Sequence, residues 1–139
     1  MSKNDFSEEV QTKQYVYIAQ SLQYASFGKI DLTDNYNSRI KALNKQENIY
    51  RYVFICEVRD MALVDYDTRA KFWDYKVDND EVDVFFLNEY LFEMYVEFIR
   101  SHPLFVSEVF IMKNPFIEQK VKEATPSSEG ETSQQMSLF

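Results

Sequence analysis

The sequence predicts a mainly helical fold, a compact domain of about five to six helices over residues 1–122 followed by a disordered tail over residues 123–139. Only two glycines, Gly28 and Gly130, occur in the chain, whereas all-β sandwiches and barrels need many turns with positive φ. Apolar residues between positions 87 and 98 recur at three- and four-residue spacing, as on a helix packed along one face. A hydrophobic content of 45% is enough for a core.

The first helix is expected to run from the N-cap Ser7 to Phe27, where Gly28 would end it. One face at helical spacing would carry Val10, Gln14, Ile18, Leu22 and Ala25. A second, shorter helix is expected after Asp34. Its apolar side would hold Tyr36, Ile40 and Leu43.

Two segments fit more than one element. Residues 49–64 are interpreted as a buried helix, although the run from Tyr50 to Cys56 is rich in strand-forming residues. Residues 73–86 alternate apolar and polar side chains across a polar connection at positions 78–81, which would make a hairpin. The alternative fold is therefore α+β, with a hairpin around residues 73–87.

The competing and favoured interpretation is a long helix from near Asp80 to Arg100. It would end before Pro103, because the residue preceding a proline avoids the α region. Further helices are expected from Pro103 to Met112 and from Pro115 to about Glu123.

The net charge of −8 is concentrated in the middle of the chain. Residues 57–97 hold four basic and twelve acidic side chains, which amounts to −8 in this segment alone. Such a segment repels phosphate, so no direct contact with nucleic acid is expected. No stretch approaches the length of a membrane span, and a single cysteine permits no internal disulfide. The expected location is the cytoplasm, with no membrane contact.

The sequence offers no constellation for catalysis, and no enzyme activity, metal or cofactor is expected. His102 is the only histidine and is interpreted as a residue at a helix C-terminus, near the negative end of the dipole. Cys56 lies in an apolar run, which indicates a buried, inert thiol.

The acidic residues of the middle segment could serve as calcium ligands or as catalytic carboxylates. Asp78, Asp80 and Glu89 fall at positions one, three and twelve of a calcium loop, but Val82 and Asp83 occupy the positions that need an oxygen ligand and a glycine. A solvated loop is therefore expected there. Acid-based catalysis would require the convergence of four carboxylates, those of Asp60, Asp65, Asp67 and Asp74.

The tail is polar until its last five residues. Between positions 123 and 134 no side chain could anchor a core, so this segment is expected to be disordered. The chain then ends with two large apolar residues in the sequence Gln135, Met136, Ser137, Leu138 and Phe139. A terminal Leu-Phe pair on such a tail is suited to a pocket on another protein.

This pentapeptide resembles the bacterial sliding-clamp-binding motif, Gln-Leu-Ser/Asp-Leu-Phe, through which polymerases, mismatch-repair proteins and other replication factors dock on the β clamp. The resemblance implies that Gln135 hydrogen-bonds at one subsite and that Leu138 and Phe139 fill a deep hydrophobic one. Met136 replaces the usual leucine with little change in volume. Ser137 fits the small or acidic position. The resemblance covers five residues of the chain.

The functional hypothesis is therefore a non-catalytic accessory or regulatory protein that is recruited to the bacterial sliding clamp in DNA replication or repair. The alternative is an acidic DNA mimic or inhibitor, of phage or mobile-element origin, that binds a basic cleft of a nucleic-acid enzyme. A homodimer that buries the Phe-rich face of residues 84–99 is compatible with either function.

Overall fold

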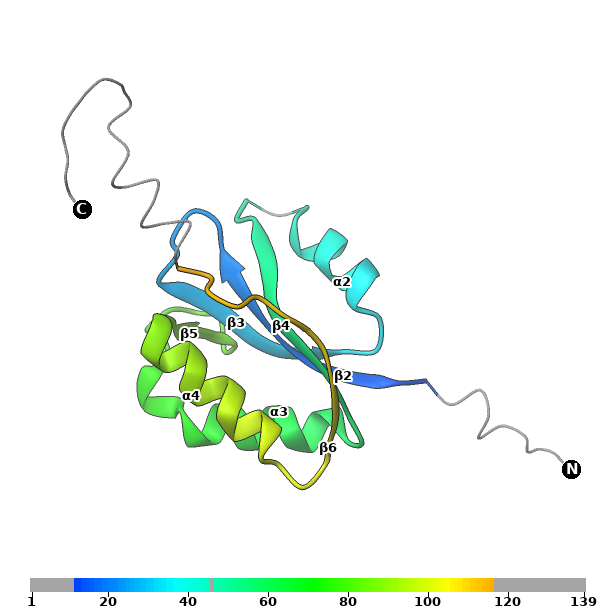
Figure 1. Cartoon of the computed structure of the whole chain (residues 1–139). Coiled ribbons are helices and arrows are strands. Elements are labelled where there is room, and N and C mark those ends of the chain that lie inside the picture. Colours follow the sequence, from blue (N-terminus) through cyan, green and yellow to red (C-terminus); the bar gives the residue numbers. More distant parts are fainter. Residues whose placement is uncertain (1–11, 46, 117–139) are drawn as a thin grey trace, which may run out of the picture.

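The computed structural model describes residues 12–45 and 47–116, which form an α+β domain and not the expected helical one (Figure 1). Within these residues there are three α-helices and five strands. In chain order the elements are β2 (Gln14–Ser21), β3 (Phe27–Thr33), α2 (Tyr36–Leu43), β4 (Tyr50–Val58), α3 (Met61–Lys71), the 3₁₀ helix η1 (Trp73–Tyr75), β5 (Val84–Phe86), α4 (Glu89–Arg100) and β6 (Phe105–Ile111).

The five strands form one antiparallel sheet in the order β5-β3-β2-β4-β6. Strands that follow one another without being neighbours are joined by helices, which therefore cross the sheet. Helices α3 and α4 cover one face, and α2 covers the other (Figure 1). The central strands are thus buried on both sides.

The prediction of a helix over residues 7–27 is wrong for the residues that the structure describes, because β2 and β3 occupy this segment. All residues from Val16 to Ser21 are buried. Val16 and Ile18 face α3 and α4, whereas Tyr17 and Ala19 face α2. A strand covered on both faces is a continuous apolar run, and such a run satisfies a helical spacing as well as a strand.

Gly28 does not end a helix but allows close packing inside the sheet. A Cβ at this position would lie 3.0 Å from Leu87 Cδ2 and 3.1 Å from the carbonyl oxygen of Ala19. The second contact is with backbone of the neighbouring strand, which cannot move without breaking the β2–β3 ladder. Glycine is therefore required at position 28 because a larger side chain does not fit between the neighbouring strand and Leu87, and not because the chain turns there.

The prediction of a buried helix over residues 49–64 is also wrong. Its first part is the strand β4, as its strand-forming residues indicate, and the helix α3 begins only at Met61. Asp60 caps this helix, because its carboxylate accepts a hydrogen bond from the Leu63 N–H at 3.1 Å. The short helix expected after Asp34 is confirmed as α2.

Residues 73–100 follow the α+β alternative in the first half and the helical interpretation in the second. Lys76 and Phe85 form an isolated antiparallel bridge, and the Val77 N–H donates to the Val84 carbonyl at 2.9 Å. Strand β5 then pairs with β3, so the expected start of a helix near Asp80 is wrong. Helix α4 begins after Asn88, whose side chain accepts from the Leu91 N–H at 2.7 Å.

Residues 105–111 form the edge strand β6, where a helix was expected. The pairing of β6 with β4 shifts register twice, and β5 at the opposite edge is only three residues long. Short and bulged edges resist pairing with strands of another molecule. The expected helix after Pro115 lies outside the described residues, apart from its first two positions.

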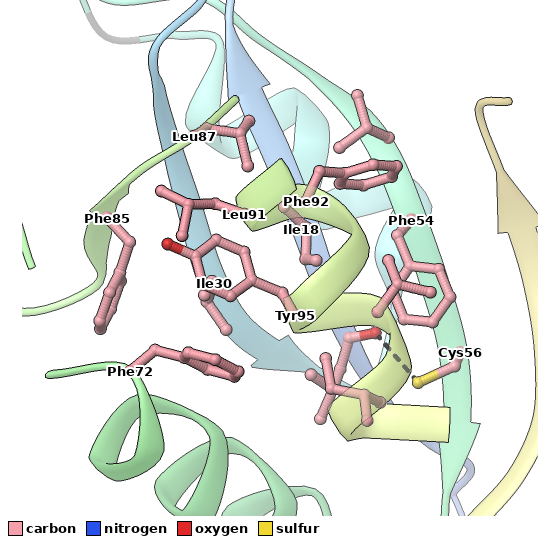
Figure 2. Packing of buried hydrophobic residues seen from close by; sticks show 14 of the residues in the cluster. Ile18, Ile30, Phe54, Cys56, Phe72, Phe85, Leu87, Leu91, Phe92 and Tyr95 are labelled. Carbon is pink, nitrogen blue, oxygen red and sulfur yellow. Dashed lines mark hydrogen bonds between the residues drawn. The ribbon is translucent and has the colours of Figure 1, made fainter. Parts of the chain in front are cut away.

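Figure 2 shows how α4 closes the larger core. Tyr95, Leu91 and Phe92 lie between α4 and sheet residues that include Ile18 and Phe54. The Tyr95 hydroxyl donates to the Phe86 carbonyl at 2.6 Å, which satisfies the polar end of a ring that is otherwise fully buried. The buried side of α4 is therefore packed within its own chain, whereas Phe86 and Tyr90 of the segment 84–99 remain exposed.

None of the helices within residues 12–45 and 47–116 combines the length and the apolar character needed to cross a membrane.

We expect Gly28→Ala to lower the free energy of unfolding by about 1–3 kcal/mol, because the added methyl group overpacks a site closed by backbone. Urea denaturation followed by circular dichroism measures the loss. Ser26→Ala is the matched control, since Ser26 is exposed two residues away. Equal stabilities of the two variants would contradict the packing role of Gly28.

Candidate functional site

The peptide predicted to bind a partner, Gln135 to Phe139, lies outside the described residues. The described chain ends at Phe116, and the structure shows how this end is held. Arg51 on β4 donates to the Pro115 carbonyl at 3.0 Å, and its Nε and Nη2 donate to Gln20 Oε1 at 3.2 and 3.0 Å. The point from which the C-terminal residues continue is therefore fixed to the central strands.

The acidic segment 57–97 builds most of the layer formed by α3, η1, α4 and their connecting loop (Figure 1). Only Asp65 and Asp83 of its twelve acidic residues are buried, and Glu57 and Asp67 are partly exposed. The other eight are exposed and comprise Asp60, Asp74, Asp78, Asp80, Glu81, Glu89, Glu93 and Glu97. The fold thus directs this charge outward over one layer.

A buried lysine ties the loop before β5 to the sheet. Lys29 on β3 is only 6% exposed, and its Nζ lies 2.5 Å from Glu81 Oε1 and 3.3 Å from Asp83 Oδ1. The ammonium also lies 5.4 Å from the centre of the Tyr50 ring. Burial alone would lower the pKa of Lys29, but the hydrogen bond to Glu81 and the charge of Asp83 raise it. The lysine therefore stays charged and paired.

A second buried group, Asp65 on α3, is less well satisfied. Its Oδ2 lies 2.5 Å from Arg69 Nη2, whereas its Oδ1 is buried without a hydrogen-bond partner among the described residues. Burial raises the pKa of Asp65 to about 7, against the opposing charge of Arg69. Burial and the neighbouring Asp83 also raise the pKa of Asp31 on β3, and the charge of Asp31 contributes to the raised pKa of Asp65.

On the face of the sheet that α2 covers, tyrosine hydroxyl groups lie beside the Asp31 carboxylate. Arg39 on α2 donates from Nε to the Tyr17 hydroxyl at 3.2 Å and lies 3.4 Å from Asp31. The Tyr52 hydroxyl donates to the Tyr36 carbonyl at 2.8 Å, and burial raises the pKa of Tyr52 to about 12. These phenols stay protonated and hold α2 on the sheet by hydrogen bonds.

The four aspartates considered for catalysis do not converge on one site, and three of them have separate partners. Asp60 caps α3, Asp65 pairs with Arg69, and Asp67 pairs with His102. Asp74 is exposed on η1. Residues 12–45 and 47–116 also contain no group of three acidic, histidine or cysteine side chains placed to hold a metal, so Asp78, Asp80 and Glu89 do not form such a cluster.

His102 and Cys56 have structural surroundings. His102 Nε2 lies 2.8 Å from Asp67 Oδ2, and its Nδ1 accepts from the Leu104 N–H at 3.1 Å. Because Nδ1 accepts, the ring proton is on Nε2, and the histidine links the end of α4 to α3. Cys56 is buried with its thiol 3.7 Å from the Val16 carbonyl, and burial raises its pKa to about 12 (Figure 2).

Sequence reasoning did not single out Lys29, Asp31 or Arg39. Lys29 meets its carboxylate partners across 52 and 54 residues of chain, and no local pattern marks such a contact. A lysine between Gly28 and Ile30 in an apolar stretch was the only signal, since a charge on a buried strand needs a partner.

Comparisons with protein-family models, with curated proteins and with solved structures find no match to this chain. Its function is therefore argued from its own residues.

Because Asp65 has a raised pKa, we expect its contribution to stability to fall as pH rises, which is the opposite of the usual behaviour of a paired carboxylate. Its native pKa of about 7 exceeds the ordinary 3.8, so the native state binds more protons between these values, and stability falls as pH rises through this window. Asp65→Asn removes this titrating group and should therefore reduce the decline in the free energy of unfolding with pH. The shift in the pKa of Asp65 limits its contribution to that decline to about 4 kcal/mol.

Thermal unfolding at pH 4.5 and pH 8 measures this difference. Asp60→Asn is the matched control, because asparagine caps a helix as well as aspartate does. A wild-type decline that survives in Asp65→Asn would show that another group causes it.

Proposed function

We propose that this protein is a non-catalytic accessory or regulatory factor in bacterial DNA replication or repair that is recruited to the sliding clamp through residues 135–139. One observation carries the proposal: all five C-terminal residues are acceptable at the corresponding positions of the clamp-binding motif. The site of action would be the cytoplasm, where the clamp operates on DNA.

The peptide would bind through two apolar side chains, and a polar side chain would set its position by hydrogen bonding. Leu138 and Phe139 would enter the hydrophobic subsite, with Met136 beside them and Gln135 hydrogen-bonded. Burial of each anchor contributes about 1.5–3 kcal/mol, whereas ordering each residue costs on the order of 1–2 kcal/mol. The surplus supports an affinity no better than about micromolar.

The body would remain close to the clamp after docking. Eighteen residues, 117–134, separate the last described residue from the peptide. A chain of this length spans at most about 59–65 Å. The acidic layer would therefore act within the neighbourhood of the clamp ring and its DNA, and a second contact by the body would strengthen binding through effective concentration.

We expect the double substitution Leu138→Ala and Phe139→Ala to weaken binding to purified β clamp by at least about a hundredfold, since both anchors are lost. Surface plasmon resonance with immobilised clamp measures the change. Ser137→Ala is the control, because the motif accepts a small residue there. Retention of the double variant on the clamp at wild-type affinity would contradict the proposal.

A second candidate function rests on the acidic layer. Its eight exposed carboxylates lie on α4, η1, the cap of α3 and the intervening loop, and Glu89, Glu93 and Glu97 form a row on one side of α4. Such a surface can occupy a basic, DNA-binding cleft of a nucleic-acid enzyme in place of phosphates. The DNA channel of the clamp itself is one cleft of this kind.

A truncated variant that ends at residue 134 distinguishes the two proposed functions, because it lacks the clamp-binding-like peptide but keeps the acidic layer. If the acidic layer enters the clamp channel, this shortened chain keeps a residual affinity that falls as salt is raised and that duplex DNA competes away. Glu93→Gln combined with Glu97→Gln should weaken that residual binding, whereas Glu47→Gln, on the α2–β4 connection, should not. Residual binding that is insensitive to salt would contradict DNA mimicry at the channel.

A further inference from the structure

Three large apolar side chains remain exposed around one hollow on the surface of α3. Tyr66 is 68% exposed, Trp73 is 55% exposed and Val82 is 63% exposed. Together with Arg69 and Ala70 they line a hollow of about 490 Å³, which we name the Trp73 hollow. Neither the C-terminal peptide nor the buried charge network explains why these side chains face solvent.

The walls of the Trp73 hollow are fixed by contacts with the core. The Trp73 ring meets Phe85 edge to face, with centroids 6.2 Å apart. Arg69 is held by the buried carboxylate of Asp65. Val82 precedes Asp83, whose carbonyl accepts from the Ile30 N–H at 2.9 Å. The site is thus already shaped, so an occupant would not have to order it.

The residue types of this hollow are those that dominate protein interfaces. Tryptophan, tyrosine and arginine are enriched among the residues that contribute most to binding, especially where they surround a pocket. Leu22 and Tyr24 are comparably exposed, but they lie on the β2–β3 turn and line none of the hollows described here. Convergence of three apolar residues from separate segments is typical of a site that receives an apolar side chain.

The surroundings of the hollow are acidic. Trp73 and Val82 also line an adjoining hollow of about 330 Å³, whose charged lining residues are Asp78, Glu81 and Lys76. Glu81 is paired with Lys29, and the Lys76 ammonium donates to the Val77 carbonyl and to Asn79. Three exposed aspartates lie close in the chain to Trp73 and Val82, namely Asp74, Asp78 and Asp80, and their carboxylates form no ion pair or side-chain hydrogen bond with the described residues. An apolar anchor in the Trp73 hollow would therefore be flanked by negative charge that favours lysine or arginine on the occupant.

We propose that the Trp73 hollow docks a segment of a partner protein that inserts an aromatic or aliphatic side chain flanked by basic residues. The site belongs to the folded body and is separate from the C-terminal peptide. It deepens the second candidate function, on which it rests for the positive charge of the partner, and adds to it an apolar anchor that fixes the register of the complex.

Trp73 is the only tryptophan of the chain, so its fluorescence reports on this hollow directly. The full-length protein is titrated with the blocked peptides Lys-Lys-Phe-Lys-Lys, Lys-Lys-Ser-Lys-Lys and Glu-Glu-Phe-Glu-Glu. The first should shift the emission to shorter wavelength and bind at least about tenfold more tightly than the other two, because only it supplies both anchor and charge. Equal binding of the Phe and Ser peptides would overturn the proposal while leaving the acidic layer as a binding surface.

Two variants test the location of binding. Val82→Ser combined with Tyr66→Ser removes exposed walls of the hollow and should weaken the Lys-Lys-Phe-Lys-Lys peptide at least about fivefold. Leu22→Ser, at a similarly exposed apolar residue, should leave binding unchanged. Equal effects of the two changes, no spectral shift with any peptide, or the same shift with phosphatidylcholine vesicles alone would each overturn a protein-docking role.

Discussion

The structure depends on the burial of the central strands on both faces of the sheet. Residues 16–21 of β2 are buried throughout, and from Val16 to Ala19 the side chains alternate between the core under α3 and α4 and the core under α2. Every helix is placed by this requirement, because each must turn its apolar side to the sheet. The polar sides of α3 and α4 then face outward together, which gathers the acidic residues of 57–97 into one layer.

Burial also explains the charges kept inside the domain. Lys29 holds Glu81 and Asp83 against β3, so the loop that carries Val82 is anchored by an ion pair that is costly to break on one side only. Asp65 holds Arg69 in the same way, at the cost of one carboxylate oxygen that has no hydrogen-bond partner within the part of the chain that the structure describes. Both pairs position the walls of the Trp73 hollow, and this link connects the stability of the core to the shape of the surface.

In the proposed function, recruitment and specific contact would be carried out by different parts of the chain. A terminal peptide of five residues can supply only modest affinity by itself, since ordering it offsets much of what its anchors contribute. The body offers what the peptide lacks, namely a fixed hollow, a negative field and a rigid frame. Both sheet edges are short or bulged, so further contacts are expected through side chains on the helical layer and not through added strands.

The sequence by itself determined the features that one local pattern encodes: α2, the one-sided helix α4, the charge of residues 57–97 and the motif-like ending from Gln135 to Phe139. Tertiary structure decided that residues 14–21 and 27–33 are strands, because burial on two faces removes the alternation that marks a strand. It also brought Lys29 to Glu81 and Asp83. No local sequence pattern predicts this contact, because the partner of a buried charge is set by the tertiary structure and can be distant along the chain.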